Sequence, residues 1–135
     1  MTMYALDTNI ISYILRGDKN VKQCWRKEES AGNRSIIPLV VYYEVRRGLL
    51  ANKATGKMRS FEELCAVLGI SDLTVADMNA ASTIYADHKI NGTLIDDTDI
   101  LIAAQCVANG YTLVTHNTRH FERIEGLQIV DWTLE

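Results

Sequence analysis

Three acidic residues stand in apolar surroundings, where a solvated surface charge is not expected. Asp7 directly follows a short apolar run, Glu44 lies among valines and tyrosines, and Asp99 precedes the apolar run Ile100–Ala104. A buried carboxylate costs several kcal/mol unless it is paired, hydrogen-bonded or bound to a metal ion. Residues of this type in this setting are therefore candidates for chemistry.

Each of the first two acids also has a structural explanation. Asp7 could cap the helix that begins after it, since aspartate is favoured at that position. Arg46 or Arg47 could neutralise Glu44 through an ion pair. Both explanations remain open from the sequence alone.

Three acids open the helix predicted over residues 96–108. Negative charge in the first turn complements the helix dipole, which explains one or two of them. We assign the plain cap to Asp97. Asp96 and Asp99 are three residues apart and share one helix face, and Asp99 should point inward because an apolar run follows it.

Clustered carboxylates repel each other, and a cation relieves that repulsion. Oxygen ligands favour Mg²⁺, with Mn²⁺ as a substitute, over zinc. Such an ion binds phosphate oxygens, activates water and stabilises in-line displacement at phosphorus. We predict Asp7, Glu44 and Asp99 as catalytic metal ligands, with Asp96 and Asn117 as ligands of second rank. Zinc is disfavoured, because the pair His116 and His120 has no second ligand pair beside it.

Strand-like segments alternate with helical ones along the chain. We expect strands over 3–6, 34–37, 73–75, 111–115 and 128–132. We expect helices over 9–15, from Asp18 or Asn20 to shortly before Gly32, over 39–51 and 58–68, from Asp77 to about residue 90, and over 96–108. This alternation predicts an α/β fold with a central parallel sheet and helices on both faces. Functional groups of such sheets lie beyond the carboxyl ends of the strands, where Asp7 and Asn117 fall.

Length and composition are compatible with one compact domain spanning residues 1–135. The net charge of −3 first argues against a nucleic-acid partner, but setting the five candidate acids, Asp97 among them, aside leaves 12 acids against 14 basic residues. RNA is therefore not excluded, although this charge balance disfavours strong non-specific electrostatic binding to it. Three separated cysteines, and no signal-like or bilayer-length apolar run, predict a cytoplasmic protein without a membrane partner.

Five short motifs occur in an order that resembles PIN-domain nucleases, most of all the VapC toxins of VapBC toxin–antitoxin pairs. They are Leu6-Asp7-Thr8-Asn9, then Glu44 with Arg47-Gly48, then Asp99 to Ala104, then Leu113 to Asn117 with Phe121, and finally Gly126-Leu127 with Asp131-Trp132. The resemblance implies a single PIN-like three-layer domain and Mg²⁺-dependent endoribonuclease activity that leaves 5′-phosphate and 3′-hydroxyl ends. It also implies structured RNA, with tRNA favoured, as substrate, a homodimer, a VapB-like antitoxin, and contact with DNA only through that antitoxin.

Residue by residue, Asp7, Glu44 and Asp99 match the acidic core of that family. Many PIN domains carry a fourth acid where this chain has Asn117. An amide can still bind Mg²⁺ or its water but adds no charge, so a tightly held second ion is in question. The predicted RNA contacts are the basic residues near the site: Arg46, Arg47, Arg119, His120 and, additionally, Arg123.

Other acid-rich α/β proteins fit the sequence less well. A haloacid-dehalogenase-type phosphatase needs a second aspartate where this chain has Asn9, and a receiver domain needs adjacent acids after its first strand and a late lysine. The non-enzymatic alternative is a PIN-like module that binds RNA or protein without cutting. Asn117 is the one feature in its favour, and three mutually repelling carboxylates argue against it.

Overall fold

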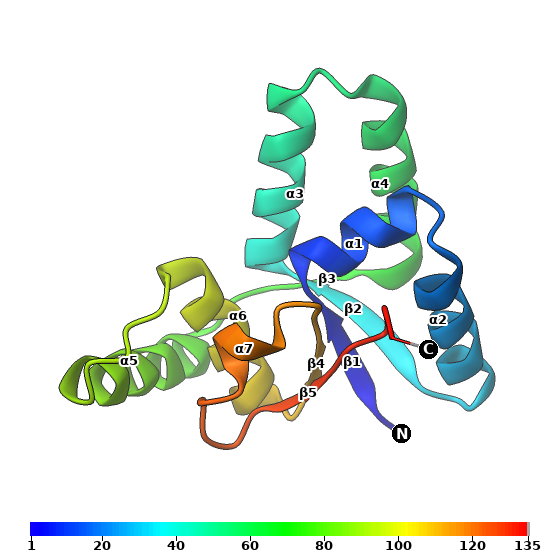
Figure 1. Cartoon of the computed structure of the whole chain (residues 1–135). Coiled ribbons are helices and arrows are strands. Elements are labelled where there is room, and N and C mark those ends of the chain that lie inside the picture. Colours follow the sequence, from blue (N-terminus) through cyan, green and yellow to red (C-terminus); the bar gives the residue numbers. More distant parts are fainter. Residues whose placement is uncertain (135) are drawn as a thin grey trace.

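The computed structural model, which describes residues 1–134, shows one five-stranded parallel sheet in the order β3-β2-β1-β4-β5 (Figure 1). The strands are β1 (Met3–Leu6), β2 (Arg34–Pro38), β3 (Ile70–Ser71), β4 (Thr112–Val114) and β5 (Gln128–Val130). The helices are α1 (Thr8–Leu15), α2 (Lys19–Ser30), α3 (Leu39–Ala51), α4 (Thr55–Leu68), α5 (Val75–Ile90), α6 (Asp97–Asn109) and α7 (Thr118–Phe121). Among these helices, none is long and apolar enough to cross a membrane.

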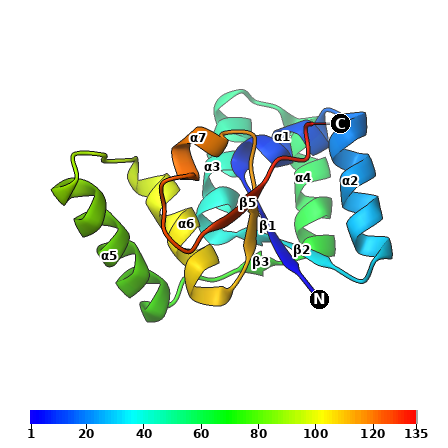
Figure 2. The ribbon, with the colours of Figure 1, turned by 60° about the horizontal axis from the view of Figure 1, so that its bottom comes forward.

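The strand order divides the helices between the two faces of the sheet. The chain proceeds from β1 through β2 to β3 in one direction and then returns to place β4 and β5 on the opposite side of β1. Right-handed crossovers therefore put α1 to α4 on one face and α5 to α7 on the other. The ribbon shows α2 and α4 on one side of the strands and α5 and α6 on the other (Figure 2). The predicted three-layer α/β fold is confirmed.

The core lies around the central strand β1. Ala5 and Leu6 at its end are fully buried, as are Leu113 of β4 and Ile10 of α1. Each large apolar side chain buried in this way stabilises the fold by about 1.5–3 kcal/mol. Asp7 comes directly after this best-packed strand, so its backbone position is well determined.

Helix α6 is anchored by the amides of buried Gln105 and exposed Asn109 as well as by apolar contacts. The Gln105 amide donates to the Ser71 carbonyl and to its hydroxyl, both at 2.9 Å, and the Asn109 amide donates to an Asp77 carboxylate oxygen at 2.9 Å. Small buried residues, Ala103 and Ala104, let the helix pack closely. These contacts fix the helix whose first turn carries Asp99.

Several predicted boundaries are wrong. The strand expected over 73–75 is instead β3 at Ile70–Ser71, and Val75 already begins α5. Thr74, not Asp77, is the N-cap of α5: its hydroxyl accepts from the Asp77 backbone, and the Asp77 carboxylate accepts from the Thr74 backbone in a reciprocal capping box. Helix α4 begins at Thr55 rather than at residue 58, and the short helix α7 was not predicted.

Candidate active site

Asp7 both caps a helix and faces a cavity. It is the N-cap of α1: one carboxylate oxygen, Oδ1, accepts from the Thr8 backbone N–H at 2.8 Å. The other oxygen, Oδ2, accepts from the hydroxyl of fully buried Thr115 at 2.8 Å. Only 4% of the residue is exposed. The structural and the functional explanations of Asp7 therefore hold together.

The protonation equilibrium of Asp7 reflects an incompletely neutralised charge. Burial raises the pKa of the carboxyl above its ordinary value, and the nearby negative charge of Asp99 raises it further. Hydrogen bonds from Thr115 and Thr8 lower the pKa but do not cancel the effect of burial. The ionised carboxylate would therefore be stabilised by a neighbouring cation.

Glu44 is placed in the same region by the second turn of α3. Its Oε1 accepts from the Thr8 hydroxyl at 2.9 Å, so Thr8 donates its backbone N–H to Asp7 and its side chain to Glu44. Its Oε2 lies 3.7 Å from the Arg47 guanidinium. The Arg47 side chain is largely exposed, so solvent screens this ion pair and it adds little to stability. Thr8 thus has a larger role than the sequence suggested.

Asp99 reaches the site from the first turn of α6 and is half-buried. Its Oδ2 lies 3.2 Å from Nδ1 of His120, the first residue after Arg119 on α7. Burial raises the pKa of Asp99, the contact with His120 lowers it, and the charges of Glu44 and Asp96 raise it. Like Asp7, Asp99 carries a charge that its neighbours do not fully compensate.

One cavity of about 370 Å³ brings these acids together. It is lined by Asp7, Thr8, Asn9, Ser12, Glu44, Asp99 and Asn117, and we call it the carboxylate cavity. It lies past the ends of β1 and β4, between which the strand order reverses. Parallel α/β sheets bind ligands at such a reversal. The structure thus brings the three predicted catalytic acids and Asn117 to one place.

Asp96 does not line the carboxylate cavity. It is the N-cap residue of α6, with an extended backbone (ψ 147°), and the helix itself begins at Asp97. Asp96 and Asp99 would share one helix face only if the backbone were helical at both positions, and the backbone of Asp96 is extended. Asp96 instead lines a neighbouring cavity, and the assignment of the cap to Asp97 is wrong.

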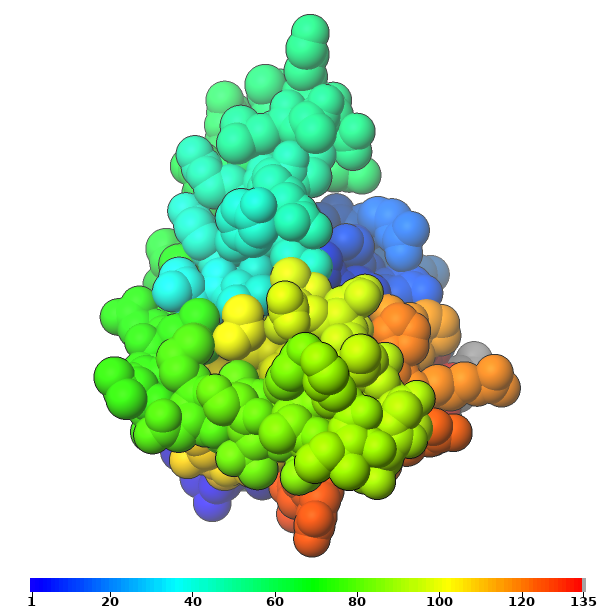
Figure 3. Space-filling model, turned by 90° about the vertical axis from the view of Figure 1, so that its left-hand side faces the viewer, coloured from blue at the N-terminus to red at the C-terminus, as the bar shows by residue number. Residues whose placement is uncertain are grey.

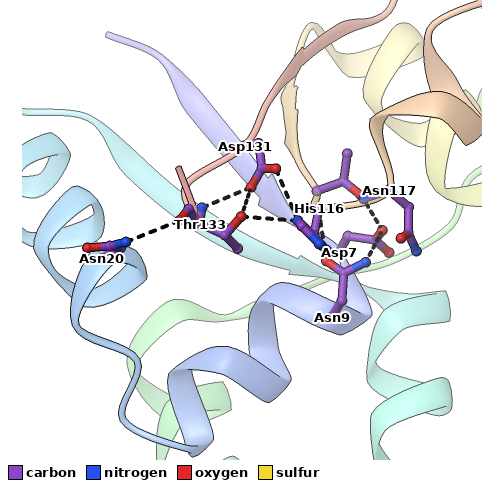
Figure 4. Close-up of polar contacts among 8 residues, drawn as sticks. Asp7, Asn9, Asn20, His116, Asn117, Asp131 and Thr133 are labelled. Atoms are coloured by element: carbon purple, nitrogen blue, oxygen red, sulfur yellow. Dashed lines mark hydrogen bonds and ion pairs between the residues drawn. The ribbon is translucent and has the colours of Figure 1, made fainter. Parts of the chain in front are cut away.

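A set of neutral side chains holds the edge of the carboxylate cavity (Figure 4). The Asn9 amide nitrogen lies 3.4 Å from Asp7 Oδ2, while its oxygen accepts from the His116 backbone N–H at 3.1 Å. The Asn117 backbone N–H donates to the Thr115 hydroxyl at 3.0 Å. These bonds tie the loop after β4 to Asp7. The positioning roles of Asn9 and Thr115 were not predicted from the sequence.

The same loop is fastened to the C-terminal segment (Figure 4). His116 Nδ1 lies 3.2 Å from an Asp131 carboxylate oxygen and 3.0 Å from the Thr133 hydroxyl. His120 meets Asp99 instead, so the two histidines have separate partners.

The predicted RNA-binding residues separate into three places. Arg46 extends toward α4, where its guanidinium lies 3.9 Å from Glu62, and it does not line the carboxylate cavity. Arg47 lies beside Glu44 and over the Tyr43 ring. Arg119 and His120 line the cavity that also contains Asp96.

The donor set of the carboxylate cavity fits a hard divalent cation. Its three carboxylates and the amides of Asn9 and Asn117 offer oxygen atoms, as Mg²⁺ prefers. Within residues 1–134, however, no three His, Cys, Asp or Glu side chains converge closely enough to form a ready-made metal cage. Separate partners account for this, because Thr115 holds Asp7, Thr8 holds Glu44 and His120 holds Asp99.

Sequence comparisons agree with this geometry. The PIN domain profile matches residues 4–127, which defines the class of domain. "Ribonuclease VapC1" of Methanocaldococcus jannaschii is 34% identical over 108 residues, covering 78% of this chain and 76% of that protein. The chain therefore belongs to the PIN-domain family and, within it, to the VapC ribonucleases.

Solved structures show the same fold. The Salmonella typhimurium VapBC complex bound to DNA contains a chain that superimposes with a TM-score of 0.85 at 27% identity, covering 98% of this chain and 99% of that one. A chain of Rickettsia felis VapBC2, bound to a DNA fragment from its promoter, gives a TM-score of 0.90 at 24% identity, covering 97% and 99%. At this identity the second likeness supports the fold alone.

Proposed function

We propose that this protein is a Mg²⁺-dependent endoribonuclease that acts as the toxin of a type II toxin–antitoxin pair. The observation that carries the proposal is the meeting of Asp7, Glu44 and Asp99 in one cavity where the strand order reverses. Three carboxylates with two raised pKa values are costly for a surface that only binds. They are useful to a site that takes up a cation together with a phosphodiester.

The residues of the chain have distinct roles in this proposal. Bound Mg²⁺ would supply Lewis acidity and charge neutralisation at the phosphate. Asp7, Glu44 and Asp99 hold the ion, and the Asn117 amide is a neutral ligand or contacts its water. Thr8 orients Asp7 and Glu44 through its two hydrogen bonds, and Thr115 fixes the second oxygen of Asp7. The products are 5′-phosphate and 3′-hydroxyl ends, and Mn²⁺ substitutes for Mg²⁺.

The partners follow from the relatives. Several structures with this fold are VapBC complexes, some of them bound to DNA. We propose that this chain is likewise inhibited by a VapB-like antitoxin, meets DNA only through it, and forms a homodimer. Structured RNA, with tRNA first, is the substrate class. Light scattering on the purified chain tests the dimer, and co-purification with the product of an adjacent reading frame tests the antitoxin.

The decisive experiment is RNA cleavage by the purified protein. Total tRNA and a synthetic stem-loop are incubated with Mg²⁺, with Mn²⁺ and with EDTA. Cleavage requires a metal ion and is lost in Asp99→Asn. Asp97→Asn is the matched control. Asp97 carries the same charge and lies two residues before Asp99, but its side chain does not line the carboxylate cavity. Cleavage that persists in EDTA, or in Asp99→Asn, would falsify the metal site.

A second experiment identifies the substrate. The gene is expressed under tight control, and new 5′ ends are mapped in total RNA after induction. A few sites in structured RNA, absent with Asp7→Asn, support the proposal. If no new ends appear while RNA still binds to the purified protein, the domain is a non-catalytic binding module.

A further inference from the structure

A second cavity adjoins the carboxylate cavity, and Asp99 lines both. Its volume is about 450 Å³, and its lining includes His88, Leu94, Ile95, Arg119 and Arg123. We call it the α5–α7 cavity, because it lies between the end of α5, the segment leading into α6, and α7 with the residues after it. The space-filling view shows the segment after α5 beside the α7 region (Figure 3). The catalytic proposal leaves this cavity unexplained.

The walls of the α5–α7 cavity combine apolar, cationic and imidazole groups. Leu94 is 56% exposed although it is a large apolar residue, and it faces this hollow together with Ile95. Arg119 and Arg123 contribute two guanidinium groups. The aliphatic side chains offer apolar contact, and the guanidinium groups offer planar surfaces and hydrogen-bond donors.

His88 gives the cavity a rigid wall. It is only 8% exposed, and its Nδ1 lies 3.1 Å from the carbonyl oxygen and 3.0 Å from the hydroxyl of Thr93. These contacts fix the orientation of the ring and leave Nε2 as its other polar atom. A buried histidine held in this way is prepared to contact a ligand in the cavity without further ordering.

The size and charge of the α5–α7 cavity favour a nucleobase over a free phosphate. Its volume lies within the range of small-molecule sites, about 300–1,000 Å³. The two arginines are opposed by Asp96, Asp99 and Glu122, so the formal charge does not select an anion. Proteins read single-stranded RNA by taking unstacked bases into pockets, against flat side chains, guanidinium planes and polar groups.

We propose that the α5–α7 cavity binds the base of the nucleotide next to the scissile phosphate and thereby selects the cleavage position. The proposal rests on the ribonuclease function proposed above. The contact between Asp99 and His120 forms the boundary between the two cavities. A phosphodiester held at the carboxylates therefore brings an adjacent nucleotide to this boundary. Leu94 and Ile95 contact the base, and Arg119 and Arg123 contact its face or its phosphate.

Base deletion combined with mutation tests the proposal. RNA oligonucleotides spanning the mapped cut are made with one abasic residue at each flanking position, and single-turnover cleavage rates are measured. In the parent protein, removing one particular base beside the cut slows cleavage by about tenfold or more, as expected for a stacked base. Removing a base that lies outside the cavity has little effect.

The variants are Arg123→Ala and Leu94→Ser, both at exposed positions, with Arg26→Ala on α2 as the control for loss of an exposed arginine. If the base and the cavity interact, the effects of base deletion and of cavity mutation on the activation free energy of cleavage are not additive. In both cavity variants, deletion of the critical base slows cleavage by less than about threefold. In Arg26→Ala it slows cleavage as much as in the parent. Melting temperatures verify that the variants fold.

The proposal would be overturned if, at every position of the RNA, the loss of cleavage rate from base deletion and the loss from cavity mutation simply multiplied. It would also be overturned if the two cavity variants weakened antitoxin binding but left the base dependence unchanged, because the cavity would then serve a protein partner. Asp99→Asn separates these failures from failure of the nuclease assignment. If Asp99→Asn abolishes cleavage and no coupling is found, only the base-binding proposal fails. If Asp99→Asn cleaves normally, the assignment of the carboxylate cavity as the nuclease active site fails first.

Discussion

Replacing Asp7 by Asn and by Ala should separate its two roles. Asn keeps the shape of the side chain, and its Oδ1 can still accept from the Thr8 backbone. The Asn amide can donate to the Thr115 hydroxyl, which has lone pairs for this bond in addition to the one from the Asn117 backbone. Ala removes every one of these contacts. We expect both variants to lose cleavage but only Asp7→Ala to lose substantial stability.

The size of the effect follows from the contacts. Loss of the helix cap costs about 1 kcal/mol. In Asp7→Ala the buried Thr115 hydroxyl loses any hydrogen-bond partner at residue 7, which costs about 1–3 kcal/mol more. For a chain of this length, about 4 °C of melting temperature corresponds to 1 kcal/mol. Asp7→Ala should therefore melt up to about 8–16 °C below the parent, less whatever is gained by removing a buried charge, and Asp7→Asn within a few degrees of it.

Thermal unfolding followed by circular dichroism in EDTA measures the stability, and cleavage of the mapped RNA in Mg²⁺ measures the activity. The comparison is made at pH 7.5 for all three proteins. If Asp7→Asn melts as low as Asp7→Ala, the negative charge itself holds the helix and the contact-based reasoning is refuted. If Asp7→Asn cleaves RNA at the parent rate, Asp7 is not a metal ligand.

Four further predictions follow from the same contacts. The pKa values of Asp7 and Asp99 are raised in the folded state, so the folded protein binds more protons than the unfolded chain at pH values between the ordinary and the raised pKa. The free energy of unfolding of the metal-free protein should therefore fall as pH rises through that window. Denaturant titrations in EDTA that show the opposite slope would contradict this. At a free Mg²⁺ concentration about 100 times its dissociation constant, binding should stabilise the parent by about 2.7 kcal/mol, or about 10 °C, and Asp99→Asn much less. Thr8→Val removes the hydroxyl that donates to Glu44 but keeps the backbone N–H that donates to Asp7. The kcat should therefore fall, while the free energy of unfolding changes by about 1 kcal/mol. An unchanged kcat would show that Glu44 does not need the Thr8 hydroxyl. An arginine of the antitoxin that pairs with the carboxylates would take the place of the ion, so added Mg²⁺ should weaken antitoxin binding. Calorimetric titrations at constant ionic strength measure this, and an unchanged affinity would place the inhibitory contact elsewhere.

The acidic part of the site was predictable because its position contradicts its surroundings. Asp7 ends an apolar strand, and Asp99 opens an apolar helix. A charge at such a position needs an explanation, and alternating strands and helices indicate that strand ends and helix starts meet at one sheet edge. These two patterns together predict both the fold class and the meeting of distant acids.

The neutral part of the site was not predictable in the same way. Thr8, Asn9 and Thr115 are ordinary residues for caps and strand ends, and their sequence positions do not distinguish a positioning role from a local one. Their roles depend on contacts between residues far apart in the sequence, 36 positions between Thr8 and Glu44 and 108 between Thr115 and Asp7. The two-residue strand β3 and the four-residue helix α7 are too short to show a clear periodicity.

The balance between the acids and their neutral partners explains how the site can fold and still attract a cation. Hydroxyl and amide donors hold Asp7 and Glu44, and His120 contacts Asp99, so that the cost of burying the acids is reduced. They do not cancel that cost, because the pKa values of Asp7 and Asp99 remain raised. Full neutralisation would remove the electrostatic attraction for a metal ion, while no neutralisation would oppose folding. Asn117, in place of a further acid, lowers the repulsion in the metal-free state and should correspondingly weaken the hold on any second ion.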